Sequence, residues 1–105
     1  MHARREIQSL EIHRRIAALL MTGPELVIGK ALSNLDSWLA SRNPSTPGSA
    51  YQEWRTLLHT RTPEEIASLI VSHDEDAVRL RQSSPFAGIL SPQEIWSIKR
   101  SHAAA

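Results

Sequence analysis

Histidine is the side chain in this sequence whose ordinary pKa best suits metal binding or proton transfer near neutral pH. The chain carries five of them: His2, His13, His59, His73 and His102. No two have the HxxxH or HExxH spacing that would bring both rings to one metal ion, so they predict no metal site. His13 falls on the same side of an expected helix as Leu10 and Ala17. We therefore expect His13 to be a packed histidine without a chemical role.

The run His73-Asp74-Glu75-Asp76 contains groups that bind cations or transfer protons in other proteins. The same carboxylates also suit the first turn of a helix, because the N-terminal end of the helix dipole is positive. Glu75 precedes Arg79 by four residues, which is the spacing of an ion pair within one helix. We therefore interpret this run as the start of a helix and not as a catalytic site.

The other residue types give no sign of catalysis either. The chain has no cysteine, which excludes disulfides, thiolate metal sites and a cysteine nucleophile. It has no glycine-rich phosphate loop and no GxSxG elbow. The sequence therefore predicts no catalytic residue, no metal and no cofactor, and we expect that the protein is not an enzyme.

The length and the net charge of the chain limit its domain organisation and its possible binding partners. A chain of 105 residues has room for one domain, and we expect a single domain over residues 1–105. Its net charge of +1 is too close to balance to predict binding to nucleic acid or membranes. The apolar run from Ile16 to Met21 is too short for a signal peptide or a membrane span. We therefore expect a cytoplasmic protein with no membrane contact.

Three segments begin helices in the same way: Thr22-Gly23-Pro24-Glu25, Thr62-Pro63-Glu64-Glu65 and Ser91-Pro92-Gln93-Glu94. In the last two, the hydroxyl is placed to cap the helix and the glutamate to complete a capping box. With the apolar periodicity, they predict helices over about residues 4–22, 24–41, 50–59, 63–71, 74–82 and 92–101. Ser72 or Asp74 is the expected cap of the fifth helix.

The fold expected from these elements is an all-α bundle of about six helices, because the sequence has no strand pattern and no hairpin turn. The two long N-terminal helices should form an antiparallel hairpin with four short helices packed on it, since short helices are marginal on their own. Residues 41–49, rich in proline and serine, should form an exposed loop. Residues 101–105 should form a frayed tail.

The segment that joins the last two expected helices is unusually apolar for a loop. Pro85 disfavours helix at Ser84 and so ends the preceding helix. Phe86, with Ile89 and Leu90, should insert between the helices as a structural wedge. We expect a positive φ at Gly88. Pro85, Phe86 and Gly88 are thus predicted to be structural residues.

Residues 62–82 have the length and apolar spacing of a helix-turn-helix, which makes DNA a possible partner. Arg79 and Arg81 on its second helix could reach phosphates. However, that helix begins with Asp74, Glu75 and Asp76, and carboxylates at this position oppose DNA binding by charge repulsion. A DNA-binding regulator is therefore the second hypothesis.

Four segments carry a resemblance to a known family: SLEIHRRIAALL followed by a proline, NLDSWL, YQEWRTLL and RLRQSSPFAGILSPQEIW. Together they resemble a family of small helical bacterial proteins that are encoded beside toxin genes and regarded as antitoxins. The likeness spans about residues 5–100, and its most specific part is RQSSPFAG. It implies a stoichiometric binder that covers or plugs a partner enzyme.

Our first hypothesis from the sequence is therefore an antitoxin-like protein that neutralises a co-encoded toxin by steric contact. Tryptophan and arginine are enriched in the residues that dominate protein interfaces. The candidate contact residues are accordingly Trp38, Trp54, Trp96, Arg79 and Arg81. A third hypothesis is a structural or adaptor protein that forms homo-oligomers.

Overall fold

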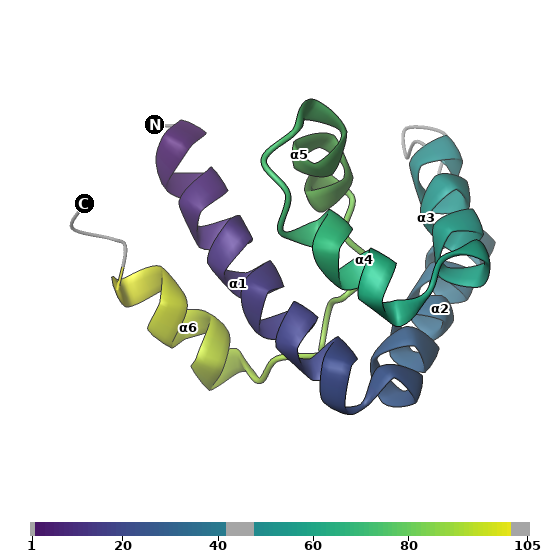
Figure 1. Ribbon diagram of the computed structural model, residues 1–105, viewed down its shortest axis with the longest axis horizontal. Coiled ribbons are helices and arrows are strands. Elements are labelled where there is room, and N and C mark those ends of the chain that lie inside the picture. The colour runs from purple at the N-terminus through teal and green to yellow at the C-terminus, as the bar shows by residue number, and fades with distance from the viewer. Residues whose placement is uncertain (1, 42–47, 102–105) are drawn as a thin grey trace.

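The computed structural model describes residues 2–41 and 48–101, and these residues form six α-helices and no strand (Figure 1). The helices are α1 (His2–Thr22), α2 (Pro24–Ala40), α3 (Gly48–Thr60), α4 (Pro63–Ile70), α5 (Glu75–Gln82) and α6 (Pro92–Ser101). The predicted all-α bundle, with two long helices followed by four shorter ones, is confirmed.

The predicted loop, residues 41–49, and the predicted tail, residues 101–105, each overlap a helix. Helix α3 begins at Gly48, so Gly48 and Ser49 form its first turn and do not belong to the predicted loop. The first turn of a helix tolerates such residues because its N–H groups have no partner within the helix. Ser101 ends α6 and is helical. The remainder of the predicted loop and of the predicted tail, residues 42–47 and 102–105, lies outside the described residues.

The predicted helix starts are confirmed in atomic detail. The Glu65 N–H donates to Thr62 Oγ1 at 3.1 Å, and the Thr62 N–H donates to Glu65 Oε1 at 2.9 Å. Ser91 and Glu94 form the same reciprocal pair before α6, with both distances at 3.1 Å. Asp74 caps α5 by accepting the Ala77 N–H. The starts of α4, α5 and α6 therefore satisfy backbone donors that the helices themselves leave unpaired.

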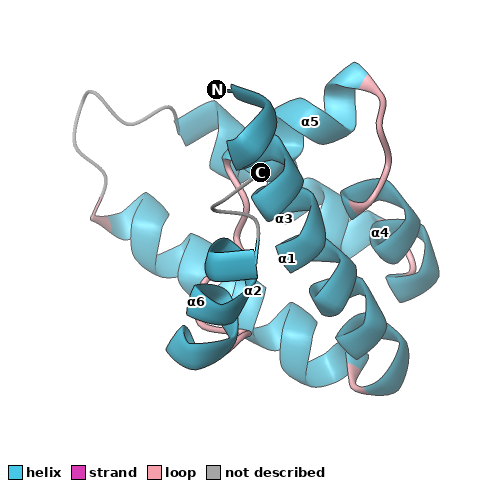
Figure 2. Ribbon diagram, turned by 90° about the vertical axis from the view of Figure 1, so that its left-hand side faces the viewer, coloured by secondary structure: helices cyan, strands magenta, loops and turns pink. Residues whose placement is uncertain are grey.

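Helix α1 is the central element of the bundle (Figures 1 and 2). After the turn at Gly23, α2 leads away from α1, and α3 returns alongside α2. Helix α4 then packs along α1, α5 packs on α4, and α6 lies on the other side of α1 from the α2–α3 pair. The chain between α5 and α6 passes behind α1 in Figure 1.

The core receives side chains from all six helices and from the α5–α6 linker, residues 83–91. The long helices contribute residues three and four apart, such as Ile16 and Leu20 of α1. This spacing places them on one helix face. Trp54 of α3 has no exposed surface, and Phe86 of the linker is 4% exposed. The linker therefore takes part in the core as fully as the helices do.

Candidate protein-docking surface

Phe86 holds the α5–α6 linker in the core. Its ring meets Trp54 edge to face, with centroids 5.5 Å apart, a favourable geometry for two aromatic rings. Trp54 is held in turn, because its indole N–H donates to the Leu80 carbonyl at 2.9 Å. Pro85 is also buried. The prediction that Pro85 and Phe86 form a structural wedge is confirmed.

Asn34 of α2 fixes the same linker through its backbone. Its side-chain amide donates to the carbonyls of Pro85 and Ala87, at 2.9 and 2.8 Å. This role of Asn34 was not predicted from the sequence. A signal was present, because Asn34 lies three residues after Ala31 and four before Trp38, so a polar side chain interrupts an otherwise apolar face of α2.

His13 of α1 is the third anchor of the linker. The ring Nδ1–H donates to the Ser9 carbonyl at 2.7 Å, which leaves Nε2 to accept the Ser84 hydroxyl at 2.8 Å. Ser84 Oγ also accepts the Phe86 N–H. Burial lowers the pKa of His13, since a charged ring loses hydration there. The predicted packed histidine is confirmed, and its neutral form fits the contacts.

This contact makes the stability of the fold depend on pH. Because the pKa of His13 in the folded protein lies below the ordinary value of 6.5, its contribution is complete above that pH. It is lost as the pH falls from there through the lower folded pKa, with a slope of at most about 1.4 kcal/mol per pH unit. Urea unfolding at a series of pH values measures this loss.

The control is His13→Gln, which cannot titrate. The difference in unfolding free energy between the wild-type protein and this variant should shrink as the pH is lowered through the same range. A difference that stays constant with pH would show that His13 is not the titrating group.

Gly88 has a φ of +82°, as predicted. Side chains strongly disfavour this left-handed conformation. A Cβ added here would also lie 3.2 Å from Cε of Lys30. The Lys30 side chain therefore runs directly over Gly88. Since the end of a lysine moves easily, backbone strain and not a clash determines the cost of a substitution.

Gly88→Ala is expected to lower the unfolding free energy by about 1–2 kcal/mol because of this strain. Gly29 of α2 is the matched control, since a Cβ added there would meet nothing within 4 Å. Gly29→Ala should instead raise stability by up to about 1 kcal/mol, as alanine favours a helix interior. Chemical denaturation measures both changes, and the same sign for both would contradict the argument.

Two of the predicted contact residues are inaccessible to a partner. Trp54 has no exposed surface, and Arg81 is 6% exposed. The Arg81 guanidinium donates to the carbonyls of Ile70 and Ser72, at 3.2 and 2.7 Å, and so binds the C-terminal end of α4. The prediction that Trp54 and Arg81 contact a partner is therefore corrected: both are structural residues.

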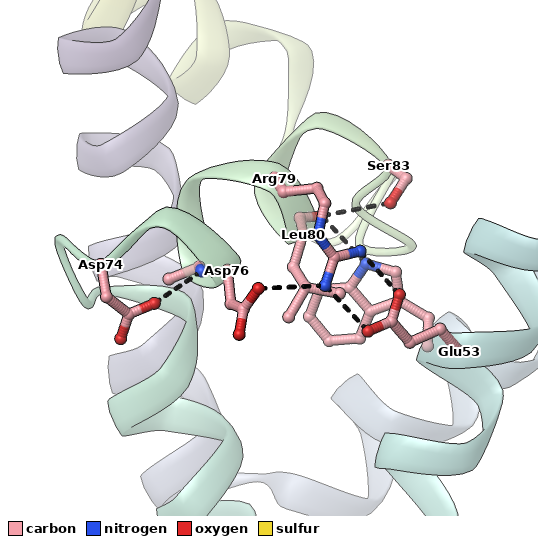
Figure 3. A network of polar contacts seen from close by, with 8 residues as sticks. Glu53, Asp74, Asp76, Arg79, Leu80 and Ser83 are labelled. Atoms are coloured by element: carbon pink, nitrogen blue, oxygen red, sulfur yellow. Dashed lines mark hydrogen bonds and ion pairs between the residues drawn. The ribbon is translucent and has the colours of Figure 1, made fainter.

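Arg79 lies on the surface but is engaged by neighbouring acids (Figure 3). It forms two parallel hydrogen bonds with the Glu53 carboxylate, at 2.7 and 3.0 Å, and a longer contact with Asp76. The predicted pair with Glu75 is replaced by these partners. The hydrogen bonds lower the pKa of Glu53 and raise the pKa of Arg79.

The DNA-binding hypothesis depends on these arginines. Of the two cations on α5, Arg79 is paired with acids and Arg81 is buried. The carboxylates of Asp74, Glu75 and Asp76 are all exposed at the start of α5. An approaching phosphate would thus meet exposed negative charge and arginines that already have partners. This arrangement is unfavourable for the recognition helix of a helix-turn-helix.

The remaining two candidates lie far from each other. Trp38 of α2 is half-buried against Tyr51 of α3, with ring centroids 5.3 Å apart. Trp96 of α6 is 62% exposed. Since α6 and the α2–α3 pair lie on opposite sides of α1 (Figure 1), the five predicted residues form no common site. Trp96 alone among the three tryptophans is largely exposed.

Trp96 borders one of two neighbouring hollows that meet at Gly88. The first, of about 410 Å³, lies between the α1–α2 turn and the linker, and the second, of about 430 Å³, lies along α6. We call them together the Gly88 surface. Its main residues are Leu19, Leu26, Lys30, Gly88, Ile89, Leu90, Ile95, Trp96 and Lys99.

The Gly88 surface gathers exposed apolar side chains. Leu19, Leu26 and Trp96 are 39%, 83% and 62% exposed, and all three line it. Leu26 was not among the predicted contact residues, although it lies outside the apolar stripe of α2 formed by Ile28, Leu32, Leu35 and Leu39. A contiguous exposed apolar patch on a folded protein is typical of a binding site for another macromolecule.

Comparisons with other proteins do not add to this site. No protein-family model matches the sequence, and neither the curated proteins nor the solved structures provide a match. Within residues 2–41 and 48–101, no group of three or more histidine, cysteine, aspartate or glutamate side chains is arranged to hold a metal ion. None of the helices in this part of the chain is long and apolar enough to cross a membrane.

Proposed function

We propose that this protein is an antitoxin-like binding protein that neutralises a co-encoded toxin enzyme in the cytoplasm. It acts by steric contact through the Gly88 surface and catalyses no reaction itself. The observation that carries the proposal is the exposure of Trp96 and Leu26 on the walls of two adjoining apolar hollows. Tryptophan is enriched among the hot spots of protein interfaces, the few residues that contribute most of the binding free energy.

Co-expression with the products of neighbouring genes tests this function. We expect one of them to arrest growth, and this protein to restore growth and to copurify with it. Trp96→Ala should lower the affinity of the complex about tenfold or more, as the loss of a hot-spot residue does. It should leave the fold intact. Affinity is measured on the purified pair, and folding by chemical denaturation.

Ile7→Ala is the matched control, because Ile7 is also an exposed apolar residue, at 46%, but does not line the Gly88 surface. It should leave affinity and rescue unchanged. Failure of every neighbouring gene product to be neutralised would refute the proposed function. Equal loss of affinity in both variants would refute the assignment of the surface.

A further inference from the structure

The two hollows of the Gly88 surface share an unusual distribution of charge. Among the residues that the structure describes, Lys30 is the one charged residue that lines the first hollow, and Lys99 is the one charged residue that lines the second. These are also the only two lysines of the chain, since every other basic side chain apart from histidine is an arginine. Both lysines are exposed. The Gly88 surface is therefore apolar and carries positive charge at two places.

Neither lysine forms an ion pair with a described residue. Arginines of the described part of the chain do form ion pairs, among them Arg14, Arg55, Arg79 and Arg81. By contrast, Lys30 and Lys99 have no acidic partner among the described residues. Interfaces bring opposite charges together at their rims, so an occupant of this surface should supply carboxylates to the two lysines.

The composition of the Gly88 surface favours a helix as occupant. The described residues contain no strand, so a partner cannot add a strand to a sheet edge here. The walls are mostly aliphatic, with Leu26, Ile89 and Ile95 among them. Aliphatic grooves bind amphipathic helices, whose apolar residues lie three to four positions apart on one face. Two hollows that meet at Gly88 can receive successive residues of such a face.

We propose that the Gly88 surface binds an amphipathic α-helix of the partner protein, whose apolar face fills the two hollows and whose flanking carboxylates pair with Lys30 and Lys99. This inference rests on the proposed function for the existence of a partner protein. It adds the chemistry of the segment that the protein recognises, an apolar helix face bordered by acidic residues.

Two designed peptides test the inference without knowledge of the partner. Each is a stabilised helix of about 16 residues with leucines along one face. One carries glutamates on both sides of the leucine stripe, and its twin carries lysines at the same positions. Fluorescence anisotropy should show that the glutamate peptide binds the full chain at least about tenfold more tightly, and that salt reduces this preference.

Charge reversal of the lysines provides the decisive comparison. Lys30→Glu combined with Lys99→Glu should invert the order of the two affinities, so that the lysine peptide binds more tightly than the glutamate peptide. Arg5→Glu combined with Arg61→Glu is the matched control, since it changes the net charge equally, replaces two exposed arginines that form none of these ion pairs, and lies outside the Gly88 surface. It should leave the order unchanged. Equal binding of both peptides, no binding of either, or inversion by the control pair would overturn the inference.

The outcomes separate this inference from the proposed function. If the Lys30→Glu, Lys99→Glu variant neutralises a toxin as well as the wild-type protein does, the inference of an acidic helix is overturned. The antitoxin function then stands. If the two peptide affinities follow the expected order but no neighbouring gene product is neutralised, the proposed antitoxin function is refuted. The preference of the Gly88 surface for an acidic helix then stands. Lysine-dependent binding to anionic lipid vesicles, without any preference between the peptides, would overturn the inference in favour of a membrane ligand.

Discussion

Phe86→Ala is expected to lower the unfolding free energy by about 3–5 kcal/mol, the usual cost of truncating a buried phenylalanine. The ring is 4% exposed and makes edge contacts with Trp54 and His13. Its removal leaves a cavity that the linker cannot close, because Asn34 holds the backbone carbonyls on either side of Phe86 and His13 holds the Ser84 hydroxyl. Chemical denaturation gives the change directly, and the melting temperature should fall by more than about 10 °C.

Trp96→Ala is the control for this measurement. It also removes a large aromatic ring, but one that is 62% exposed, and surface substitutions usually change stability by less than about 0.5 kcal/mol. An unchanged melting temperature for Phe86→Ala would mean that the ring does not occupy the core in solution. The linker would then have to be reassigned as part of the contact surface.

The second large effect is expected at Arg81. Arg81→Ala should lower the unfolding free energy by about 2–4 kcal/mol, because it leaves the carbonyls of Ile70 and Ser72 without their charged donor. It also removes the packed stem of a buried side chain. Loss of a positive charge near the negative end of the α4 dipole adds to the cost. Urea unfolding at neutral pH measures the change.

Arg79→Ala is the matched control, since it removes the same side chain from the same helix. Its ion pair with Glu53 is exposed to solvent, and such pairs contribute little to stability and weaken with salt. We expect a much smaller loss for Arg79→Ala than for Arg81→Ala. The reverse order would show that the surface pair, and not the buried guanidinium, holds α5 in place.

The features that sequence reasoning predicted correctly depend on neighbours along the chain. Thr62 and Glu65 form a capping box three residues apart, and the apolar stripes follow the period of one helix. The positive φ of Gly88 is likewise a local property of a turn. Such signals can be read without knowing how the helices pack.

The errors concern partners that are distant in sequence. Arg79 and Arg81 were grouped together, although residues two apart on a helix point in nearly opposite directions. The packing of α5 on α4 buries Arg81, whereas Arg79 stays at the surface and pairs with Glu53, which lies 26 residues earlier in the chain. Trp54 and Trp96 both occupy apolar positions of their helices, but α3 presents its tryptophan to the core and α6 to solvent.

The composition of the Gly88 surface has a consequence for the newly made protein. Its first hollow combines early-translated residues such as Leu26 and Lys30 with Gly88 and Ile89, and its second is built from residues 88–99. A nascent chain that has been translated only as far as Gln82 lacks both Trp96, which lines the second hollow, and Phe86, which fills the core. A partner that recognises both hollows is therefore expected to capture the protein only after translation of α6, and to leave unfinished chains alone.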